Sequence, residues 1–374
     1  MPAIKIRLTL VLTLIFSTCL FSACEKYPEL PKSTQATGKL TILDALGQDR
    51  KTGWWPRVQF DKDEQPHLAY CDVYHGNLMY AKRKSNGTWI TKPLVTAGAV
   101  GKYISLSIDP NNRAALLYYD QTMKYLKYSY QIEDEVWKHE NVAWGIEAGM
   151  GNTLLFNPKK EPVAFYYLPS GKFVYATRQV DGTWSKSVLM ESTGSYYVKT
   201  SALFDHEKLW VSFIDWNFKD TILHMGLRDN AKSEFKIGIV TEKNGPGWTS
   251  KLLMLPDGIK LLYSVNRKKQ IHLSHFGPEG WVTENPLIPF ALSFDAAVSP
   301  DGELVVAYED LSTAYNEPSP LRLLRKKGKT VKLTTIDQYG PEGDHIAIAI
   351  SPKGKLVVAY HSIQNLGLKV YEED

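Results

Sequence analysis

Two sets of side chains able to bind ligands recur at regular spacing in this 374-residue sequence. Both are placed relative to a series of seven aromatic residues. Fifteen residues before four of these aromatics stand Trp55, Tyr103, Trp248 and His345. Two residues after four of them stand Asp72, Asp120, Asp215 and Asp310. Aromatic rings stack on the apolar faces of sugars, and carboxylates accept hydrogen bonds from sugar hydroxyls. If the fold gathers both sets, we expect a carbohydrate-binding surface.

The four aspartates also suit a structural role. An aspartate after a strand commonly caps a turn by accepting a backbone N–H two residues on, and a repeat would copy that turn. The positions of the aromatic set vary more between copies, because Gly151, Val198 and Ser293 occupy them elsewhere. This variation favours a binding role for the aromatic residues and His345.

The seven aromatic residues define an internal repeat. They follow one another at intervals of 45 to 52 residues, at Tyr70, Tyr118, Tyr166, Phe213, Tyr263, Tyr308 and Tyr360. Each copy holds four strand-sized runs bounded by turn residues, and four strands at a period in the forties are typical of a propeller blade. The sequence therefore predicts an all-β chain that forms a single seven-bladed β-propeller over residues 38–374. Its blades are expected to be four-stranded and antiparallel.

The ends of the repeat array predict how the ring closes. The last copy ends after three strands, and the strand-like run 38–46 precedes the first copy without a partner of its own. We expect this N-terminal strand to complete the last blade, with Leu40 and Ile42 beside residues 369–371, which removes an exposed sheet edge. Antiparallel order then brings the start of each innermost strand and the end of each second strand to one face, around the central channel.

Two turns carry a family resemblance. The runs Asn86-Gly87-Thr88-Trp89 and Asp181-Gly182-Thr183-Trp184 resemble the end of the Asp box in BNR repeats of sialidase-like propellers, without the serine that precedes it. The box is a structural turn in that family, so we expect its tryptophans, and Trp137 and Trp281, in the core. Sialidase activity would imply three arginines around a carboxylate, a tyrosine nucleophile with a glutamate, and an aspartate acid. Only Arg57, with Arg113 or Arg178, is available, so no catalytic residue is assigned.

The N-terminus has the parts of an export signal. Basic Lys5 and Arg7 precede an apolar stretch, residues 8–16, and small residues precede Cys24. The run Leu-Phe-Ser-Ala-Cys ending at Cys24 resembles a bacterial lipobox, with an ordinary secretory leader as the alternative. The resemblance implies a lipoprotein signal peptide over residues 1–23 and a lipidated Cys24 at the start of a flexible tether, residues 24–37. Glu25 favours the outer membrane as the location within the cell envelope.

Composition narrows the function. A nearly balanced net charge of +4 argues against nucleic-acid binding, and the basic run 325–329 lies at an expected turn, which favours a solvated edge. No metal-ligand or nucleotide-binding motif is present, so we expect neither metal nor cofactor. The sequence predicts a monomeric, membrane-anchored, non-catalytic lipoprotein that binds a glycan or an envelope protein through one propeller face. The alternative is a carbohydrate-active enzyme using the same face. A glycoside hydrolase would pair two of the aspartates, and a polysaccharide lyase would use His345 or His361 with a tyrosine.

Overall fold

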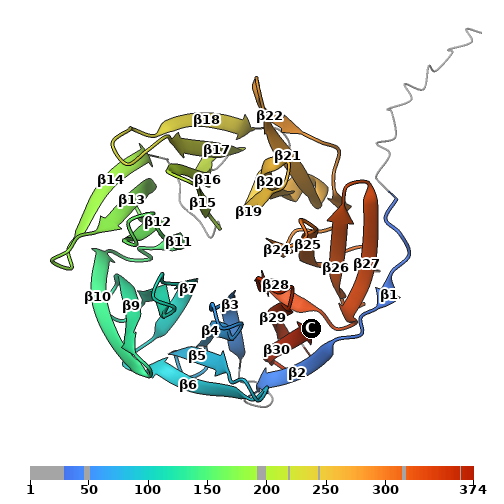
Figure 1. Ribbon diagram of the computed structural model, residues 1–374, viewed down its shortest axis with the longest axis horizontal. Helices are drawn as coiled ribbons and strands as arrows, with labels where there is room; N and C mark the ends of the chain where they lie inside the picture. The colour runs from blue at the N-terminus through green and yellow to red at the C-terminus, as the bar shows by residue number, and fades with distance from the viewer. Residues whose placement is uncertain are drawn as a thin grey trace, which may run out of the picture.

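The structure of the protein is a computed structural model that describes residues 29–45, 51–191, 199–217, 220–242, 245–313, 317–362 and 364–374. The predicted signal peptide and Cys24 lie outside the described residues. Seven antiparallel sheets form a ring around a central channel (Figure 1), which confirms the predicted seven-bladed propeller. Among the described residues, no helix is both long and apolar enough to span a bilayer.

The first strand of each blade lines the channel, and the later strands follow outwards in chain order, except that the N-terminal segment supplies the outermost strands of the last two blades. Blade 1 consists of β3 (Thr52–Phe60), β4 (Pro66–Asp72), β5 (Asn77–Arg83) and β6 (Trp89–Val95). Blade 2 consists of β7 (Val100–Ile108), β8 (Ala114–Asp120), β9 (Tyr125–Glu133) and β10 (Val136–Trp144). Blade 3 consists of β11 (Met150–Phe156), β12 (Pro162–Tyr167), β13 (Lys172–Arg178) and β14 (Trp184–Glu191). Blade 4 consists of β15 (Ser201–Asp205), β16 (Lys208–Asn217), β17 (Asp220–Arg228) and β18 (Lys236–Thr241).

The remaining three blades carry additions to this plan. Blade 5 consists of β19 (Pro246–Leu255), β20 (Gly258–Val265), the short helix η1 (Asn266–Lys268), β21 (Gln270–Gly277), β22 (Gly280–Thr283) and β23 (Ile288–Pro289). Blade 6 consists of β24 (Phe294–Val298), β25 (Leu304–Glu309), β26 (Leu321–Lys327), β27 (Thr330–Asp337) and the added β1 (Thr34–Gln35). Blade 7 consists of β28 (Pro341–Ile350), β29 (Leu356–Ser362), β30 (Gly367–Glu373) and β2 (Lys39–Asp44).

The ring closes as the sequence predicts. Strand β2 pairs antiparallel with β30, and Leu40 lies opposite Tyr371 while Ile42 lies opposite Lys369. The structure adds a second contact that sequence reasoning did not anticipate. Thr34 and Gln35, within the expected tether, pair in parallel with the outer strand of blade 6. The N-terminal segment therefore holds two neighbouring blades.

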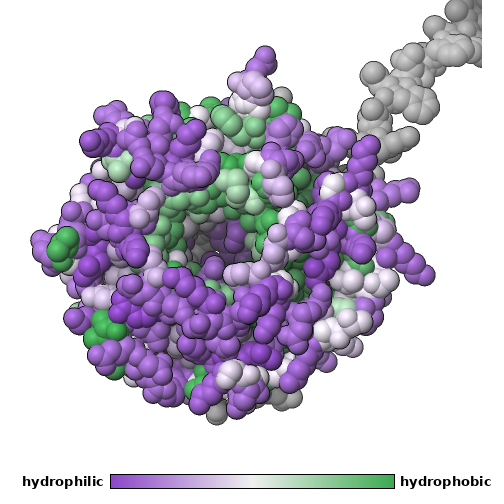
Figure 2. Space-filling model, viewed as in Figure 1, coloured by the Kyte–Doolittle hydropathy of each residue, from purple (hydrophilic) through white to green (hydrophobic). Residues whose placement is uncertain are grey.

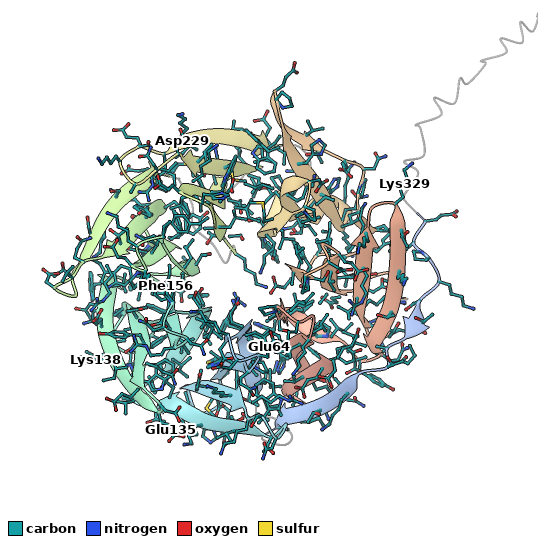
Figure 3. All side chains as sticks on the ribbon, in the orientation of Figure 1. Glu64, Glu135, Lys138, Phe156, Asp229 and Lys329 are labelled. Carbon is teal, nitrogen blue, oxygen red and sulfur yellow. The ribbon has the colours of Figure 1, made fainter. Side chains whose placement is uncertain are left out.

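The core lies between the blades. The second strands are buried along almost their whole length, and each of the seven repeat aromatics is at most 2% exposed. Burial on both sides explains why these strands are continuously apolar. The four tryptophans expected in the core, Trp89, Trp137, Trp184 and Trp281, are partly buried and pack against the buried clusters. Charged residues such as Lys138, Asp229 and Lys329 lie at the outer edge, which is mostly hydrophilic around a central hollow (Figures 2 and 3).

A hydrogen bond between repeat positions ties blade 7 to blade 1. The Tyr70 hydroxyl donates to Oδ2 of Asp44 at 2.7 Å, at the end of β2. Burial, followed by the charge of Asp44, raises the pKa of Tyr70, so the hydroxyl keeps its proton and remains a donor. At the same repeat position in blade 3, the buried Tyr166 hydroxyl has no hydrogen-bond partner among the described residues.

We expect Tyr70→Phe to lower the free energy of unfolding by about 1.5–3 kcal/mol, because it removes a hydrogen bond to a charged group. Tyr166→Phe is the matched control and is expected to be neutral or slightly stabilising, since it removes a buried hydroxyl that bonds to nothing described. Urea unfolding of both variants measures the difference. Equal effects would show that the Tyr70–Asp44 bond contributes nothing to closure.

Candidate functional site

The innermost strands begin on the same face on which the second strands end. At the start of β3, Thr52 lies opposite Asp72 at the end of β4, and Val100 and Asp120 are paired in the same way in blade 2. We call this side of the ring the mouth face. It carries all the predicted binding positions that the structure describes, as antiparallel order requires.

A cavity of about 250 Å³ occupies the channel at the centre of the ring. Six of the seven blades contribute the same register position to its wall. This position is the residue of the innermost strand that pairs with the residue just before the repeat aromatic. These residues are Arg57, Ser105, Thr153, Ser201, Lys251 and Asp295. Blade 7 has Ala347 at this position, and its neighbours Ile346 and Ile348 line the cavity instead. Apolar residues of other blades, such as Ile104, Leu106 and Leu252, also line the cavity, so the wall is mixed polar and apolar.

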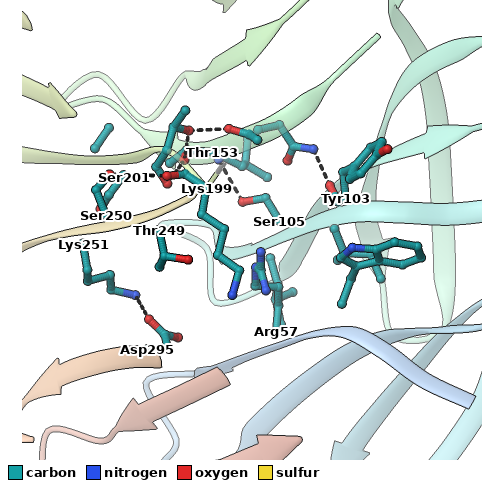
Figure 4. A pocket seen from close by; sticks show the side chains of 18 of the residues that line it. Arg57, Tyr103, Ser105, Thr153, Lys199, Ser201, Thr249, Ser250, Lys251 and Asp295 are labelled. Atoms are coloured by element: carbon teal, nitrogen blue, oxygen red, sulfur yellow. Dashed lines mark hydrogen bonds and ion pairs between the residues drawn. The ribbon is translucent and has the colours of Figure 1, made fainter. Parts of the chain in front are cut away.

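These wall positions also join neighbouring blades from blade 2 to blade 7 (Figure 4). The Leu154 N–H donates to Ser105 Oγ at 2.9 Å, and the Leu252 N–H donates to Ser201 Oγ at 3.0 Å. Between blades 3 and 4, Thr153 Oγ1 donates to a backbone carbonyl at 3.0 Å. Most of the hydroxyl groups in the wall are thus fixed in orientation, which preorganises the surface that a ligand would meet.

The charged residues of the described wall are Arg57, Lys199, Lys251 and Asp295. Lys251 Nζ lies 2.8 Å from Oδ1 of Asp295, whose Oδ2 accepts the Ile348 N–H at 3.2 Å. Burial alone would raise the pKa of Asp295, but Lys251, then Lys199 and Arg57, lower it by more. Asp295 is consequently ionised at neutral pH. In Figure 4 the side chain of Lys199 extends across the cavity toward Arg57.

Two aromatic residues form the wall near the mouth. Trp55 and Tyr103 both line the cavity, with ring centroids 5.7 Å apart in an edge-on arrangement. Both have positive φ, 51° and 54°, a conformation that bulky residues rarely adopt. Each follows by two residues a glycine of positive φ, Gly53 or Gly101, and the strand pairing is shifted on both sides. Such bulges redirect a side chain out of the regular pleat, which here brings these rings to the cavity.

Hydrogen bonds fix the position of the Tyr103 ring. Its hydroxyl donates to Glu147 Oε2 at 2.5 Å, and the Glu147 N–H donates to the hydroxyl of Tyr119 at 2.7 Å. The Asn152 side chain donates to the backbone carbonyls of Tyr103 and Gly149. Asn152 is 7% exposed and lines the cavity, and its Oδ1 has no hydrogen-bond partner in the described structure.

His345 lies at the junction of blades 7 and 1, in contact with both Trp54 and Trp55. Burial first, and then the charges of Lys199, His361 and Arg57, holds the pKa of His345 well below its usual value, so the ring is neutral at pH 7. Its Nδ1 accepts the Trp55 N–H at 3.2 Å. The proton of the neutral ring therefore lies on Nε2, which makes His345 a hydrogen-bond donor and leaves no available lone pair for a general base.

Trp248 is at the mouth but outside the cavity wall. Its side chain is 48% exposed, and its backbone carbonyl accepts the Lys199 N–H at 2.6 Å. The following residue, Thr249, lines the cavity. An exposed indole beside the opening suits stacking on a ligand that extends out of the cavity.

The four predicted aspartates lie on the mouth face but do not line the cavity. Asp72 accepts the His75 N–H at 3.1 Å, and Asp120 accepts the Met123 N–H at 2.9 Å while pairing with Lys127. Asp310 accepts the Ser312 N–H at 2.9 Å and pairs with Arg322 at 2.5 Å. Asp215 is partly exposed near the end of β16 and lies opposite Ile222. Three of the four therefore cap a turn, Asp310 through the N–H two residues on and Asp72 and Asp120 through the N–H three residues on.

Sequence reasoning missed much of the wall, including Lys199, Lys251 and Asp295. A count of fifteen residues before each repeat aromatic points to the bulge and not to the regular strand that follows it. The available signal was a polar or charged residue twelve or thirteen residues before the repeat aromatic in six of the seven copies. Among the described residues, no group of three or more histidine, cysteine or acidic side chains is placed to hold a metal.

No known protein family matches the sequence, and no curated protein matches it. Solved structures share its fold. A protein of unknown function from Dyadobacter fermentans is 12% identical with a TM-score of 0.55, over 89% of this chain and 98% of that one. An ulvan lyase, a polysaccharide lyase, is 12% identical with a TM-score of 0.56, over 88% of this chain and 95% of the lyase. The lectin SapL1, bound to α-methyl fucoside, is 12% identical with a TM-score of 0.52, over 77% of this chain and 97% of the lectin. These similarities establish the propeller fold.

Proposed function

We propose that the protein binds a saccharide at the mouth of its central cavity and is a lipid-anchored, monomeric component of the cell envelope. The observation that carries the binding proposal is the combination of Trp55 and Tyr103 with a wall of fixed hydroxyl, amide and charged groups in one cavity. A pocket with an apolar platform and a few oriented polar groups is the usual form of a small-ligand site. Trp248 extends this surface beyond the opening.

The structural neighbours support a saccharide over other ligands. One is a lectin in complex with a fucoside and another is a polysaccharide lyase, so this fold is used for carbohydrate binding and for carbohydrate cleavage. Lipid attachment at Cys24, the outer membrane as location and an envelope protein as the alternative partner remain part of the proposal on the strength of the sequence alone.

The chemistry of the cavity favours binding over cleavage. Hydrolysis by a carboxylate pair needs two such groups about 5–10 Å apart, and Asp295 is the single carboxylate of the described wall, already paired with Lys251. A lyase that used His345 as its base would need the lone pair that His345 spends on the Trp55 N–H. A carbohydrate-active enzyme is thus the second candidate.

The test is a glycan array probed with soluble residues 25–374, followed by titration of any sugar that binds. Changing both Trp55 and Trp248 to alanine is expected to weaken binding by a hundredfold or more, because each aromatic platform typically accounts for tenfold or more. Trp248→Ala alone should weaken binding about tenfold without changing the melting temperature, since its side chain is half-exposed.

Trp144→Ala is the matched control. Trp144 is an exposed tryptophan, 67% accessible, that lies outside the cavity wall, and its loss should leave affinity unchanged. If Trp144→Ala and Trp248→Ala have equal effects, the mouth of the cavity is not the binding site. If the double variant unfolds, Trp248→Ala and Trp55→Phe decide between a platform and a core role.

A further inference from the structure

The charged wall of the cavity restricts the class of saccharide. Among the described lining residues three are basic, Arg57, Lys199 and Lys251, and one is acidic, Asp295. Lys251 and Asp295 form an ion pair and a blade-to-blade contact, so they fill the structural role that serines and threonines fill in other blades. Arg57 and Lys199 come from blades 1 and 4, and their side chains extend toward one another across the cavity (Figure 4).

From this arrangement we propose that the bound saccharide is acidic and that its carboxylate or sulfate group is held between Arg57 and Lys199. The inference deepens the proposed saccharide binding and rests on it. An arginine offers a planar pair of donors that matches either anion, and a lysine adds a second charge from another direction. Two positive charges that approach each other in a partly enclosed space are stabilised when an anion lies between them.

Two further features fit an anionic group at this place. Arg57 and Lys199 both lower the pKa of Asp295 and of His345, after the effects of burial and nearer groups. Trp55 lies on the same strand as Arg57, and its ring contacts Tyr103 of the next blade and the neutral His345. A sugar ring stacked on the aromatics would thus carry an acidic substituent toward the two cations.

The experiment compares acidic oligosaccharides with their neutral counterparts by calorimetric titration of soluble residues 25–374. Oligogalacturonate and its carboxyl-reduced form test a carboxylate, and κ-carrageenan oligosaccharide and its desulfated form test a sulfate. We expect at least one acidic member to bind tenfold or more tightly than its neutral partner, and to weaken as salt is raised. Arg57→Gln and Lys199→Gln should each weaken that binding about 10- to 100-fold and leave the neutral partner unaffected.

Lys329→Gln provides the matched control, because Lys329 is exposed at the outer edge of the ring (Figure 3). Lys199→Arg retains the charge and should retain most of the affinity, which separates loss of charge from loss of fold. If acidic and neutral partners bind equally, or if Lys199→Gln behaves as Lys329→Gln does, the acidic class is wrong while saccharide binding stands. If neither member of either pair binds and the glycan array is blank, both proposals fall.

Discussion

A chain that begins at Ala45 is expected to lose the cooperative unfolding transition of the closed ring. Such a truncation removes β2, whose six residues form the outer strand of blade 7, and with it the Asp44 carboxylate that accepts the Tyr70 hydroxyl. Each lost ladder hydrogen bond is worth about 1 kcal/mol, and Leu43 also leaves the cluster between blades 7 and 1. The summed loss is comparable with the roughly 5–15 kcal/mol that stabilises a typical domain.

A second truncation serves as the control. A chain that begins at Thr37 lacks β1 but keeps β2. It loses the two-residue pairing with β27, the Ala36 N–H bond to Thr335 and the packing of Leu30 and Ala36 against buried clusters. It should lose about 1–2 kcal/mol and still unfold in one transition by calorimetry. A peptide of residues 34–45, added to the chain that begins at Ala45, should restore the cooperative unfolding transition. Identical melting of the two truncated chains would contradict closure by β2.

Lys369→Met is expected to lower the free energy of unfolding at pH 7 by about 3–5 kcal/mol, because it leaves a buried carboxylate without its counter-ion. Lys369 Nζ lies 2.7 Å from Oδ2 of Asp337, and both side chains are less than 10% exposed. The same oxygen accepts the hydroxyl of Tyr360, the repeat aromatic of blade 7, at 2.5 Å. The double variant Lys369→Met, Asp337→Asn should recover part of the loss.

The pH dependence of this pair gives an independent readout. Burial raises the pKa of Asp337, but Lys369 and the hydrogen bonds from Tyr360 and the Tyr339 N–H lower it by more, so the folded value lies below the ordinary one. The contribution of Asp337 to stability is therefore complete above its unfolded pKa, about 3.9, and is lost as the pH falls through the folded value. In Lys369→Met the ionised carboxylate is destabilised. The difference in free energy of unfolding between wild type and variant should therefore narrow toward pH 3. A gap independent of pH would mean that Lys369 acts through packing.

The fold was predictable because the sequence contains an internal repeat. The seven aromatics are buried at the same place in every blade, and a period of 45 to 52 residues allows four strands and little else. The closing register was predictable from Leu40 and Ile42 because the incomplete last copy left one vacant strand position. Strand β1 was not predictable, since two residues of parallel pairing leave no periodic pattern.

The cavity was only partly predictable. Trp55 and Tyr103 were found because aromatic side chains interrupt the repeat at a fixed offset. Lys199 and Asp295 were not, because which side of an innermost strand faces the channel depends on bulges that shift the register by a residue. The aspartates were found by spacing, but spacing alone does not distinguish a carboxylate that caps a turn from one that faces a ligand.

The attachment of the N-terminal segment to two blades has a mechanical consequence. If the protein is anchored at Cys24 as proposed, five residues separate the lipidated cysteine from Leu30. The ring therefore stays within about 20 Å of the bilayer. Tension on the anchor would reach the protein through β1 and then β2, which are paired along their lengths with β27 and β30. A pull along these strands loads their hydrogen bonds together in shear instead of opening them one at a time, and shields the cavity wall on the opposite side of each blade from the load.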